Sequence, residues 1–300
     1  MTKAGETNLQ DYLSEQVQLI DHALNEWVPG EHIEPLSIHQ AMRYSLFAGG
    51  KRIRPVLAIA AARAVSDSPD GIEYAACTLE LIHTYSLIHD DLPALDNDDL
   101  RRGRPTCHKV FGDAMAILAG DALLTLAFEV LSRLRHINGD RKIRLVEELS
   151  RSAGTVGGMI AGQVNDIEGE GRHPTAALLE SIHRAKTGAL ICASVRMGGI
   201  YAGATEKELT ALSDYGEHVG LAFQIIDDVL DVEESSESLG KTAGKDEVQK
   251  KVTFPAVYGL RRSREMAEEE RLAAHVALRI FDDRAERLRQ IADFIVHRKT

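Results

Sequence analysis

Cysteine, proline and aromatic residues are all scarce in this sequence of 300 residues. It has three cysteines, which are far apart and lack zinc-ligand spacing: Cys77, Cys107 and Cys192. This spacing suggests neither a disulfide framework nor a structural metal site, and it favours a reducing compartment, for which we expect the cytoplasm. Eight prolines and 5% aromatic residues, beside 44% hydrophobic residues, favour helices over sheets.

The sequence also lacks an excess of basic residues, since its formal net charge is −11 at pH 7. A nucleic-acid binder needs a broadly basic face, so the charge argues against that class. There is no apolar signal-peptide core near residue 1 and no uniformly apolar stretch of the ~20 residues that a membrane span needs. We therefore expect no integral membrane segment. An anionic ligand would have to be bound by local basic clusters, namely residues 49–55 ("GGKRIRP") and 100–105 ("LRRGRP").

Helical periodicity runs through most of the chain. In residues 9–27 the apolar side chains recur at helical spacing, with Thr7 or Asn8 available as the N-cap. Similar patterns recur as far as Phe281, and no pair of alternating strands joined by a turn signal is found. The polar segments between them are too short for an interdomain linker. We therefore expect one all-α domain over residues 1–300.

Two clusters of aspartate lie in otherwise apolar sequence, where a charge is costly unless it is paired or binds a metal. In "LIHDDLPALDNDDLRRGRP" (residues 87–105), Asp90 and Asp96 are six apart, which would set them on different sides of an unbroken helix. Pro93 lacks an amide donor and interrupts the helix, so we expect Asp96 to return beside Asp90. A run of like charges is usually a solvated surface segment, but this one directly follows an apolar helix.

The second cluster lies in "QIIDDVLD" (residues 224–231). Asp227 and Asp231 are about 40° apart on a helical wheel, so both carboxylates project from one face, which Gln224 joins one turn earlier. Such clusters suit Mg²⁺, which takes one or two carboxylates and completes its octahedron with water and phosphate oxygens. Ca²⁺ is the competing metal, but the EF-hand pattern is absent. Basic side chains near the motifs would then bind a diphosphate: Lys51, Arg52, Arg54, Arg101 and Arg102.

Successive blocks of the sequence resemble those of the trans-isoprenyl diphosphate synthase family. The blocks are "GGKRIRP", "IHTYSLIHDDLPALDNDDLRRGRPTCH", "ILAGDALLTLAF", "GQVNDIEGEG", "HRAKTGALI", "GLAFQIIDDVLDV", "LGKTAGKDE" and "KKVTFPAVYGL". They follow the family's order over about residues 10–298, and bacterial farnesyl diphosphate synthases are the closest match. One departure is Asn97, which stands where relatives often continue the aspartate run.

The resemblance implies an all-α fold around a deep central cavity, with the two aspartate motifs facing each other at its mouth. It implies a prenyltransferase that condenses isopentenyl diphosphate with dimethylallyl or geranyl diphosphate to give farnesyl diphosphate. About three Mg²⁺ ions would bridge the aspartates and the diphosphate, and water would be excluded during the reaction. The partners would be small-molecule diphosphates rather than nucleic acid, and the chain would form a homodimer.

Motif positions in the resemblance also imply roles for individual residues. The metal ligands would be Asp90, Asp91, Asp96, Asp227 and Asp231. The isopentenyl diphosphate site would contain Lys51, Arg54, His83 and Arg102. The allylic diphosphate site would contain Arg101, Lys186, Thr187, Gln224, Lys241 and Lys251. Catalysis would depend on Asp90, Asp96, Lys186 and Asp227, and the floor of the cavity, which limits chain length, would be formed by Tyr85.

Several of these residues also have purely structural interpretations. Taken alone, His83 fits a satisfied histidine and Thr187 a helix-interior residue. Gln224 fits a buried amide, and Tyr85 fits an ordinary core tyrosine. The lysine-rich segment 235–251 is either a solvated loop or a lid over the diphosphate. Geranylgeranyl or geranyl diphosphate synthesis and a non-catalytic partner subunit are the alternative functions, whereas a terpene cyclase has no need for the "GGKRIRP" block.

Overall fold

The computed structural model describes the chain in three segments, residues 8–169, 175–237 and 253–298. It is 79% helical with almost no strands, which confirms the all-α class. Its contacts divide the chain into two compact units. Unit 1 comprises Met1–Ile59 and Pro69–Val146, and unit 2 comprises Ala60–Ser68 and Glu147–Thr300. Both units contain buried hydrophobic side chains of their own.

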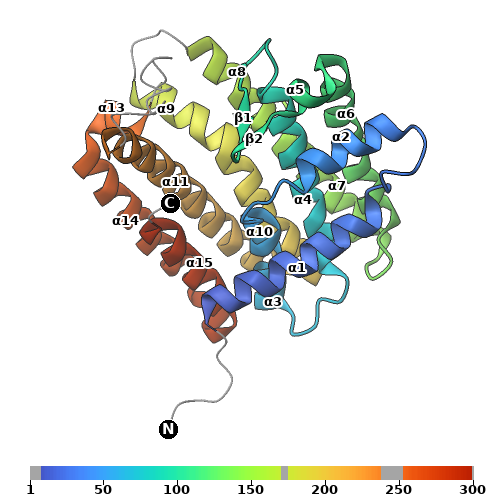
Figure 1. Cartoon of the computed structure of the whole chain (residues 1–300). Coiled ribbons are helices and arrows are strands. Elements are labelled where there is room, and N and C mark those ends of the chain that lie inside the picture. Colours follow the sequence, from blue (N-terminus) through green and yellow to red (C-terminus); the bar gives the residue numbers. More distant parts are fainter. Residues whose placement is uncertain (1–7, 170–174, 238–252, 299–300) are drawn as a thin grey trace. The chain divides into compact units, whose positions relative to one another are not determined.

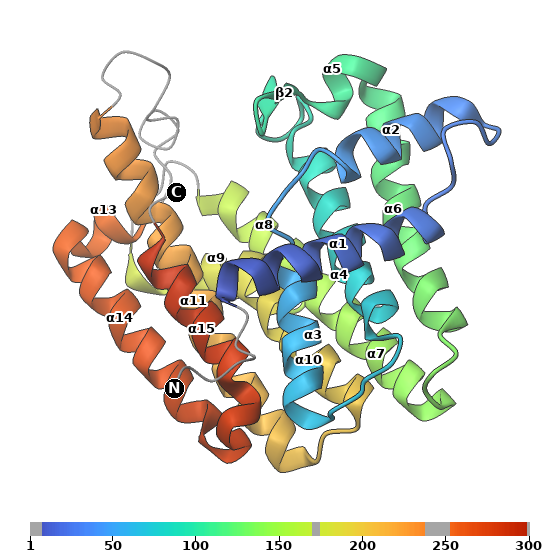
Figure 2. The same cartoon turned by 60° about the horizontal axis from the view of Figure 1, so that its bottom comes forward.

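Unit 1 is built around α4, a largely buried helix. Its elements are α1 (Leu9–Trp27), α2 (Leu36–Leu46), α4 (Ile72–Asp90), β1 (Leu100–Arg101), β2 (Arg104–Pro105), α5 (Cys107–Phe111) and α6 (Asp113–Arg133), with the first parts of α3 (Ile53–Val65) and α7 (Gly139–Ala153). The side of α4 packs along α6 (Figure 1), and α1 and α2 also contact α4 (Figure 2). The first aspartate motif therefore begins at the end of a core helix.

Unit 2 is organised around the long helix α11. Its elements are α8 (Met159–Gly169), α9 (Ala176–His183), η1 (Arg184–Gly188), α10 (Ala189–Ala202), α11 (Glu206–Glu237), α13 (Phe254–Tyr258), α14 (Leu260–Ala277), η2 (Leu278–Ala285) and α15 (Glu286–His297). Helices α10, α14 and α15 all pack against α11 (Figure 1). The second aspartate motif lies in the C-terminal half of α11, so packing holds it on a continuous helix.

The first helix forms where its sequence pattern predicts. Its N-cap is Asn8, whose side-chain oxygen accepts a hydrogen bond from the Asp11 amide at 3.1 Å. The apolar side chains of α1, among them Leu13, Ile20 and Leu24, are buried. Helical spacing and a capping residue thus suffice to predict both ends of α1, at Leu9 and Trp27.

The periodic stretch over residues 142–164 forms two helices, α7 and α8, instead of one. Gly157 adopts a φ of +69°, a left-handed conformation that interrupts a helix and that glycine adopts without a steric penalty. Gly158 lies so close to the backbone of Arg151 that a Cβ would collide with its carbonyl oxygen. The glycines of this stretch therefore serve a turn, which periodicity alone does not reveal.

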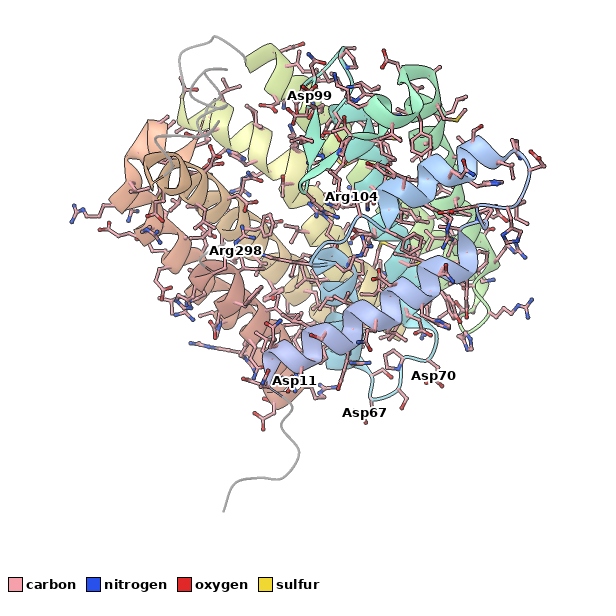
Figure 3. The ribbon with its side chains drawn as sticks, in the orientation of Figure 1. Asp11, Asp67, Asp70, Asp99, Arg104 and Arg298 are labelled. Atoms are coloured by element: carbon pink, nitrogen blue, oxygen red, sulfur yellow. The ribbon has the colours of Figure 1, made fainter. Side chains whose placement is uncertain are left out.

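A small hairpin follows the first aspartate motif, where the sequence analysis expects no strands. β1 pairs with β2 in antiparallel register. Between them Arg102 and Gly103 have positive φ values of 52° and 73°. Asp99 and Arg104, which lie just before β1 and within β2, are labelled in Figure 3. Two residues per strand are too few to produce an alternating pattern, which explains why the sequence does not predict this hairpin.

Among the described residues, α6 is the one helix that is long and apolar enough to cross a membrane. This is weak evidence, because a core helix passes the same test. In unit 1, α6 packs against α2, α4 and α5. Its side chains Leu123, Ala127 and Val130 are fully buried. These contacts bury one side of α6, whose apolar window is 39% buried in the structure.

Candidate active site

The first aspartate motif follows the end of α4. This helix stops at Asp90, before Pro93. The chain then folds back, and the Asp96 amide donates a hydrogen bond of 2.9 Å to the Asp90 carbonyl oxygen. The predicted return of Asp96 to Asp90 is therefore confirmed for the backbone. Both residues are half-buried, so their carboxylates lie at a partly open face of unit 1.

The neighbouring Asp91 has a different environment. Asp91 is only 3% exposed. Arg101 of the hairpin donates through Nε to both Asp91 carboxylate oxygens, at 2.8 and 3.0 Å. The Arg101 Nη2 lies 2.6 Å from Asp91 Oδ1. Burial raises the pKa of Asp91, and the hydrogen bond and charge of Arg101 only partly offset this. Asp91, which the resemblance includes among the metal ligands, is thus enclosed with a cationic partner.

The two basic clusters of the sequence meet in unit 1. A Cβ on Gly50 would stand 2.7 Å from the Arg102 guanidinium, so this guanidinium lies directly over the glycine. Burial lowers the pKa of His83 well below its usual range, and neighbouring positive charges lower it further. Those charges belong to Arg54, Arg102, Arg101 and Arg52. A neutral imidazole surrounded by guanidinium groups is suited to an anionic ligand. The structure thereby brings together His83, Arg54 and Arg102, while Lys51 is exposed.

Arg52 does not have the role predicted from the sequence, which is to bind diphosphate. Its side chain is 1% exposed and lies 2.6 Å from Glu80, which is also buried. It donates further hydrogen bonds to Asp21 at 3.0 Å and to the Leu46 carbonyl oxygen at 2.7 Å. Each of its three guanidinium nitrogens donates a hydrogen bond within unit 1, so buried Arg52 holds helices together and is not available to a ligand.

Tyr85 lies one turn before His89 on α4 and is 6% exposed. Its ring meets the His89 ring edge-on, with 5.8 Å between the centroids. Among the described residues its hydroxyl oxygen is buried without a hydrogen-bond partner, and burial, followed by the charge of Asp90, raises its pKa to about 12. The side chain is thus a bulky, neutral group in the interior of unit 1.

The second motif contains aspartates in contrasting environments. Asp227 and Asp231 lie four residues apart on the continuous helix α11, as the sequence predicts, and Gln224 is half-buried one turn earlier. Between them Asp228 is buried, and its carboxylate accepts a hydrogen bond of 2.9 Å from the Phe254 amide. As in the first motif, the second aspartate of the pair serves the packing of its own unit.

Lys186 and Thr187 lie in η1, a π-helical turn within the helical run of α9 and α10. Such turns are frequent at functional sites because they redirect side chains. The Lys186 ammonium group donates a hydrogen bond of 2.6 Å to Asp166 on α8. A Cβ on Gly162 would collide with the Lys186 backbone, so glycine is what allows α8 and η1 to approach here. Thr187 is half-buried beside Lys186.

Two of the residues expected to bind the allylic diphosphate, Lys241 and Lys251, lie outside the described residues, as does most of segment 235–251. Two further residues of unit 2 contact the proposed site residues and are not predicted from the sequence. Asp166 is the partner of Lys186, and its only signal is its place in the "GQVNDIEGEG" block. Arg298 forms an ion pair with Asp227, and no sequence pattern near either residue predicts this contact.

A divalent cation fits the aspartates that remain at open faces. Within the described residues no three acidic, histidine or cysteine side chains are gathered closely enough to hold a metal by themselves. Mg²⁺ does not require three, because it takes one or two carboxylates and keeps water or phosphate oxygens as its other ligands. Asp90 and Asp96 offer hard oxygen donors from adjoining backbone segments. At Asp227 the guanidinium of Arg298 already stands where a cation is expected.

Comparison with known proteins gives one consistent family. The polyprenyl synthetase family matches residues 35–293, a range that includes residues of both units. "Geranylgeranyl pyrophosphate synthase 4" of Arabidopsis thaliana is 46% identical over 295 residues, which are 97% of this chain and 78% of that protein. "Farnesyl diphosphate synthase" of Geobacillus stearothermophilus is also 46% identical, over 91% of this chain and 90% of its own. The structure of an FPP/GFPP synthase from Zymomonas mobilis matches with a TM-score of 0.85 and 35% identity, covering 96% of this chain and 99% of that one.

Proposed function

Because the chain belongs to the polyprenyl synthetase family and is thus a prenyltransferase of isoprenoid biosynthesis, we propose that its product is farnesyl diphosphate. The substrates would be isopentenyl diphosphate with dimethylallyl and then geranyl diphosphate. The observation that carries this choice of product is the bulky, buried ring of Tyr85, five residues before Asp90. A packed interior tolerates little added volume, so a phenol ring at the end of the chain-binding space stops elongation by steric overlap.

The proposed reaction has three steps: the carbon–oxygen bond of the allylic diphosphate ionises, the isopentenyl double bond attacks the carbocation, and a proton is lost. Mg²⁺, when bound, would supply positive charge to the departing diphosphate. The aspartates proposed to hold it are Asp90, Asp96, Asp227 and Asp231. We assign Asp91 a different task, because its contact with Arg101 orients that guanidinium.

Cationic side chains would hold the two diphosphates. For isopentenyl diphosphate we propose the cluster of Lys51, Arg54, His83 and Arg102. For the allylic diphosphate we propose Arg101, Lys186, Thr187 and Gln224, with Lys241 and Lys251 from the part of the chain outside the described residues. Neutral His83 would donate a hydrogen bond without adding charge, while the arginines offer planar, bidentate forks to phosphate oxygens. Asp166 would keep the Lys186 ammonium in position until the diphosphate binds.

Geranylgeranyl diphosphate synthesis is the second candidate. It is supported by relatives that carry this activity in their names, including the Arabidopsis thaliana protein that matches 97% of this chain. The two candidates differ in one round of condensation. In the farnesyl case Tyr85 would block the fourth isoprene unit, whereas in the geranylgeranyl case the ring would be part of the core and another residue would set the length.

Product analysis of the wild-type protein tests this proposal. The protein would be incubated with Mg²⁺, dimethylallyl diphosphate and labelled isopentenyl diphosphate, and the dephosphorylated products separated by chromatography. We expect a fifteen-carbon alcohol as the main product and no product when a chelator is in excess. A main product of twenty carbons would support the second candidate, and hydrolysis without condensation would contradict both.

We also propose that the chain acts as a homodimer. In unit 1, Ile117 and Leu118 of α6 are exposed. In unit 2, the exposed side chains Ile160, Val164 and Ile167 recur at helical spacing along α8. Exposed apolar side chains at such spacing favour a protein partner. Light scattering after gel filtration tests this, since a mass of one chain would contradict it.

For the compartment we propose the cytoplasm. Three unpaired cysteines, two of them buried, support a reducing environment. Some relatives carry the word chloroplastic in their names, so the protein's own location has to be measured. Fractionation of the source cells, followed by detection of the protein, would test this.

A further inference from the structure

Arg298 makes a contact that its position does not predict. It follows directly after α15, and its side chain is only 8% exposed. Its guanidinium forms an ion pair with Asp227 Oδ1, and the same group lies over the Phe223 ring, 4.4 Å from the centroid. Phe223 and Asp227 are one turn apart on α11. One guanidinium is therefore held by both a carboxylate and an aromatic face. Figure 3 labels Arg298.

This contact concerns the carboxylate that begins the second aspartate motif. An arginine is always charged at physiological pH, so Asp227 has a permanent positive neighbour. Mg²⁺ binds carboxylate oxygens at about 2.0–2.1 Å and demands near-ideal octahedral geometry. The guanidinium and the metal ion would compete for Oδ1, and their like charges repel at such a distance. Metal binding through Oδ1 of Asp227 thus requires that Arg298 leave this oxygen.

We propose that Arg298 is the resident counter-ion of Asp227 and sets the affinity of the second motif for its metal. This inference rests on the proposed function, in which Asp227 binds Mg²⁺. In the metal-free protein Asp227 balances the charge of Arg298, whose side chain is only 8% exposed, because a buried charge without a partner is costly; the contact in turn orients the carboxylate. When the metal binds, the guanidinium gives up the carboxylate. The Phe223 ring offers it a second attachment at the same place.

The affinity of the protein for Mn²⁺, measured by electron paramagnetic resonance as a probe for Mg²⁺, tests this without any turnover. Arg298→Ala removes a competing charge-assisted contact, so we expect Mn²⁺ to bind about ten- to a hundredfold more tightly. Arg298→Lys keeps the charge and should stay closer to wild type. Circular dichroism of each variant would verify that it is folded.

Arg264→Ala is the matched control. Arg264 also pairs with an acidic residue of α11, Glu233, at 2.5 Å, and removing it changes the net charge by the same amount. We expect its Mn²⁺ affinity to stay within about twofold of wild type, because Arg264 pairs with Glu233 instead of Asp227 and screening weakens the effect of an exposed charge. Equal tightening by both arginine variants would mean a general charge effect and would overturn the inference.

Asp227→Asn separates this inference from the proposed function. If Asp227→Asn weakens Mn²⁺ binding while Arg298→Ala leaves it unchanged or weaker, Asp227 is a metal ligand but Arg298 does not compete, and only the inference fails. If Asp227→Asn has no effect on Mn²⁺ binding, the proposed metal role of Asp227 fails and the inference fails with it. Weaker binding in Asp227→Asn together with tighter binding in Arg298→Ala supports both.

Discussion

Arg52→Ala should destabilise the protein strongly, although Arg52 lies in a motif that resembles a substrate-binding block. The substitution removes hydrogen bonds to Glu80, Asp21 and the Leu46 carbonyl. It also leaves the Glu80 carboxylate, which is 3% exposed, buried without its cation. Removing one partner of a buried ion pair typically costs about 3–5 kcal/mol. With a slope of about 2–4 °C per kcal/mol, the melting temperature should fall by roughly 6–20 °C.

Urea unfolding followed by circular dichroism would measure this loss, and Lys51→Ala is the matched control. Lys51 is the preceding residue and is exposed, so its removal should change the free energy of unfolding by no more than about 0.5 kcal/mol. It should instead raise the Michaelis constant for isopentenyl diphosphate by about tenfold or more, since a charge-assisted contact is lost. Of these two neighbouring basic residues, Arg52 would thus stabilise the fold and Lys51 would bind substrate.

A double variant sharpens the test. Replacing the buried pair with apolar residues, as in Arg52→Met with Glu80→Leu, should recover most of the lost stability, because no unpaired charge remains. If Arg52→Ala instead unfolded at the wild-type urea concentration and raised the Michaelis constant as Lys51→Ala does, Arg52 would be a ligand contact and the reasoning would be refuted.

Three further predictions concern two aspartates of the first motif and a buried histidine. Asp90→Asn should cut turnover by orders of magnitude with an unchanged circular dichroism spectrum, and near-normal turnover would exclude it as a metal ligand. Asp91→Asn should raise the Michaelis constant for the allylic diphosphate about tenfold, by releasing Arg101, yet keep Mg²⁺ affinity within about twofold; a large loss of metal affinity would make Asp91 a ligand. Burial lowers the pKa of His183 to about 4, so the unfolded state takes up a proton that the native state does not, and stability is lost as the pH falls from about 6.5 toward 4. In that window His183 should contribute about 1.4 kcal/mol per pH unit to the free energy of unfolding. Urea unfolding at several pH values should show that this free energy depends less steeply on pH in His183→Gln than in the wild type. The same pH dependence in both proteins would contradict this.

The sequence predicts the helices and the backbone of the motifs well, because both depend on neighbouring residues. The end of α4 and the return of Asp96 follow from Pro93, and the shared face of Asp227 and Asp231 follows from the continuity of α11. Local chemistry decides these features: a missing amide donor in one case and the helical repeat in the other.

What the sequence could not predict depends on partners far along the chain. Lys51 and Arg52 look alike in "GGKRIRP", and only Glu80 and Asp21, about thirty residues away in either direction, make one of them structural. In the same way, Asp91 cannot be distinguished from Asp90 until the hairpin brings Arg101 back to it. Long-range ion pairs of this kind leave no local pattern.

The second motif also contains neighbouring aspartates that the sequence alone does not distinguish. Asp227 and Asp228 are adjacent and identical in type, but Asp228 accepts from the Phe254 amide on one side of α11 while Asp227 contacts Arg298. Neither partner is near in sequence. Burial and pairing, which require the fold, decide which carboxylate remains for a metal.

The product length of Tyr85→Ala beside the wild-type protein tests the central claim most directly. Both proteins would be given the same labelled isopentenyl diphosphate with dimethylallyl diphosphate and Mg²⁺, and the dephosphorylated products would be compared on one chromatogram. We predict fifteen carbons for the wild type and a shift to twenty or more for Tyr85→Ala, because removing the ring opens space for another isoprene unit. A folded, active Tyr85→Ala variant that still makes the wild-type product would contradict the account.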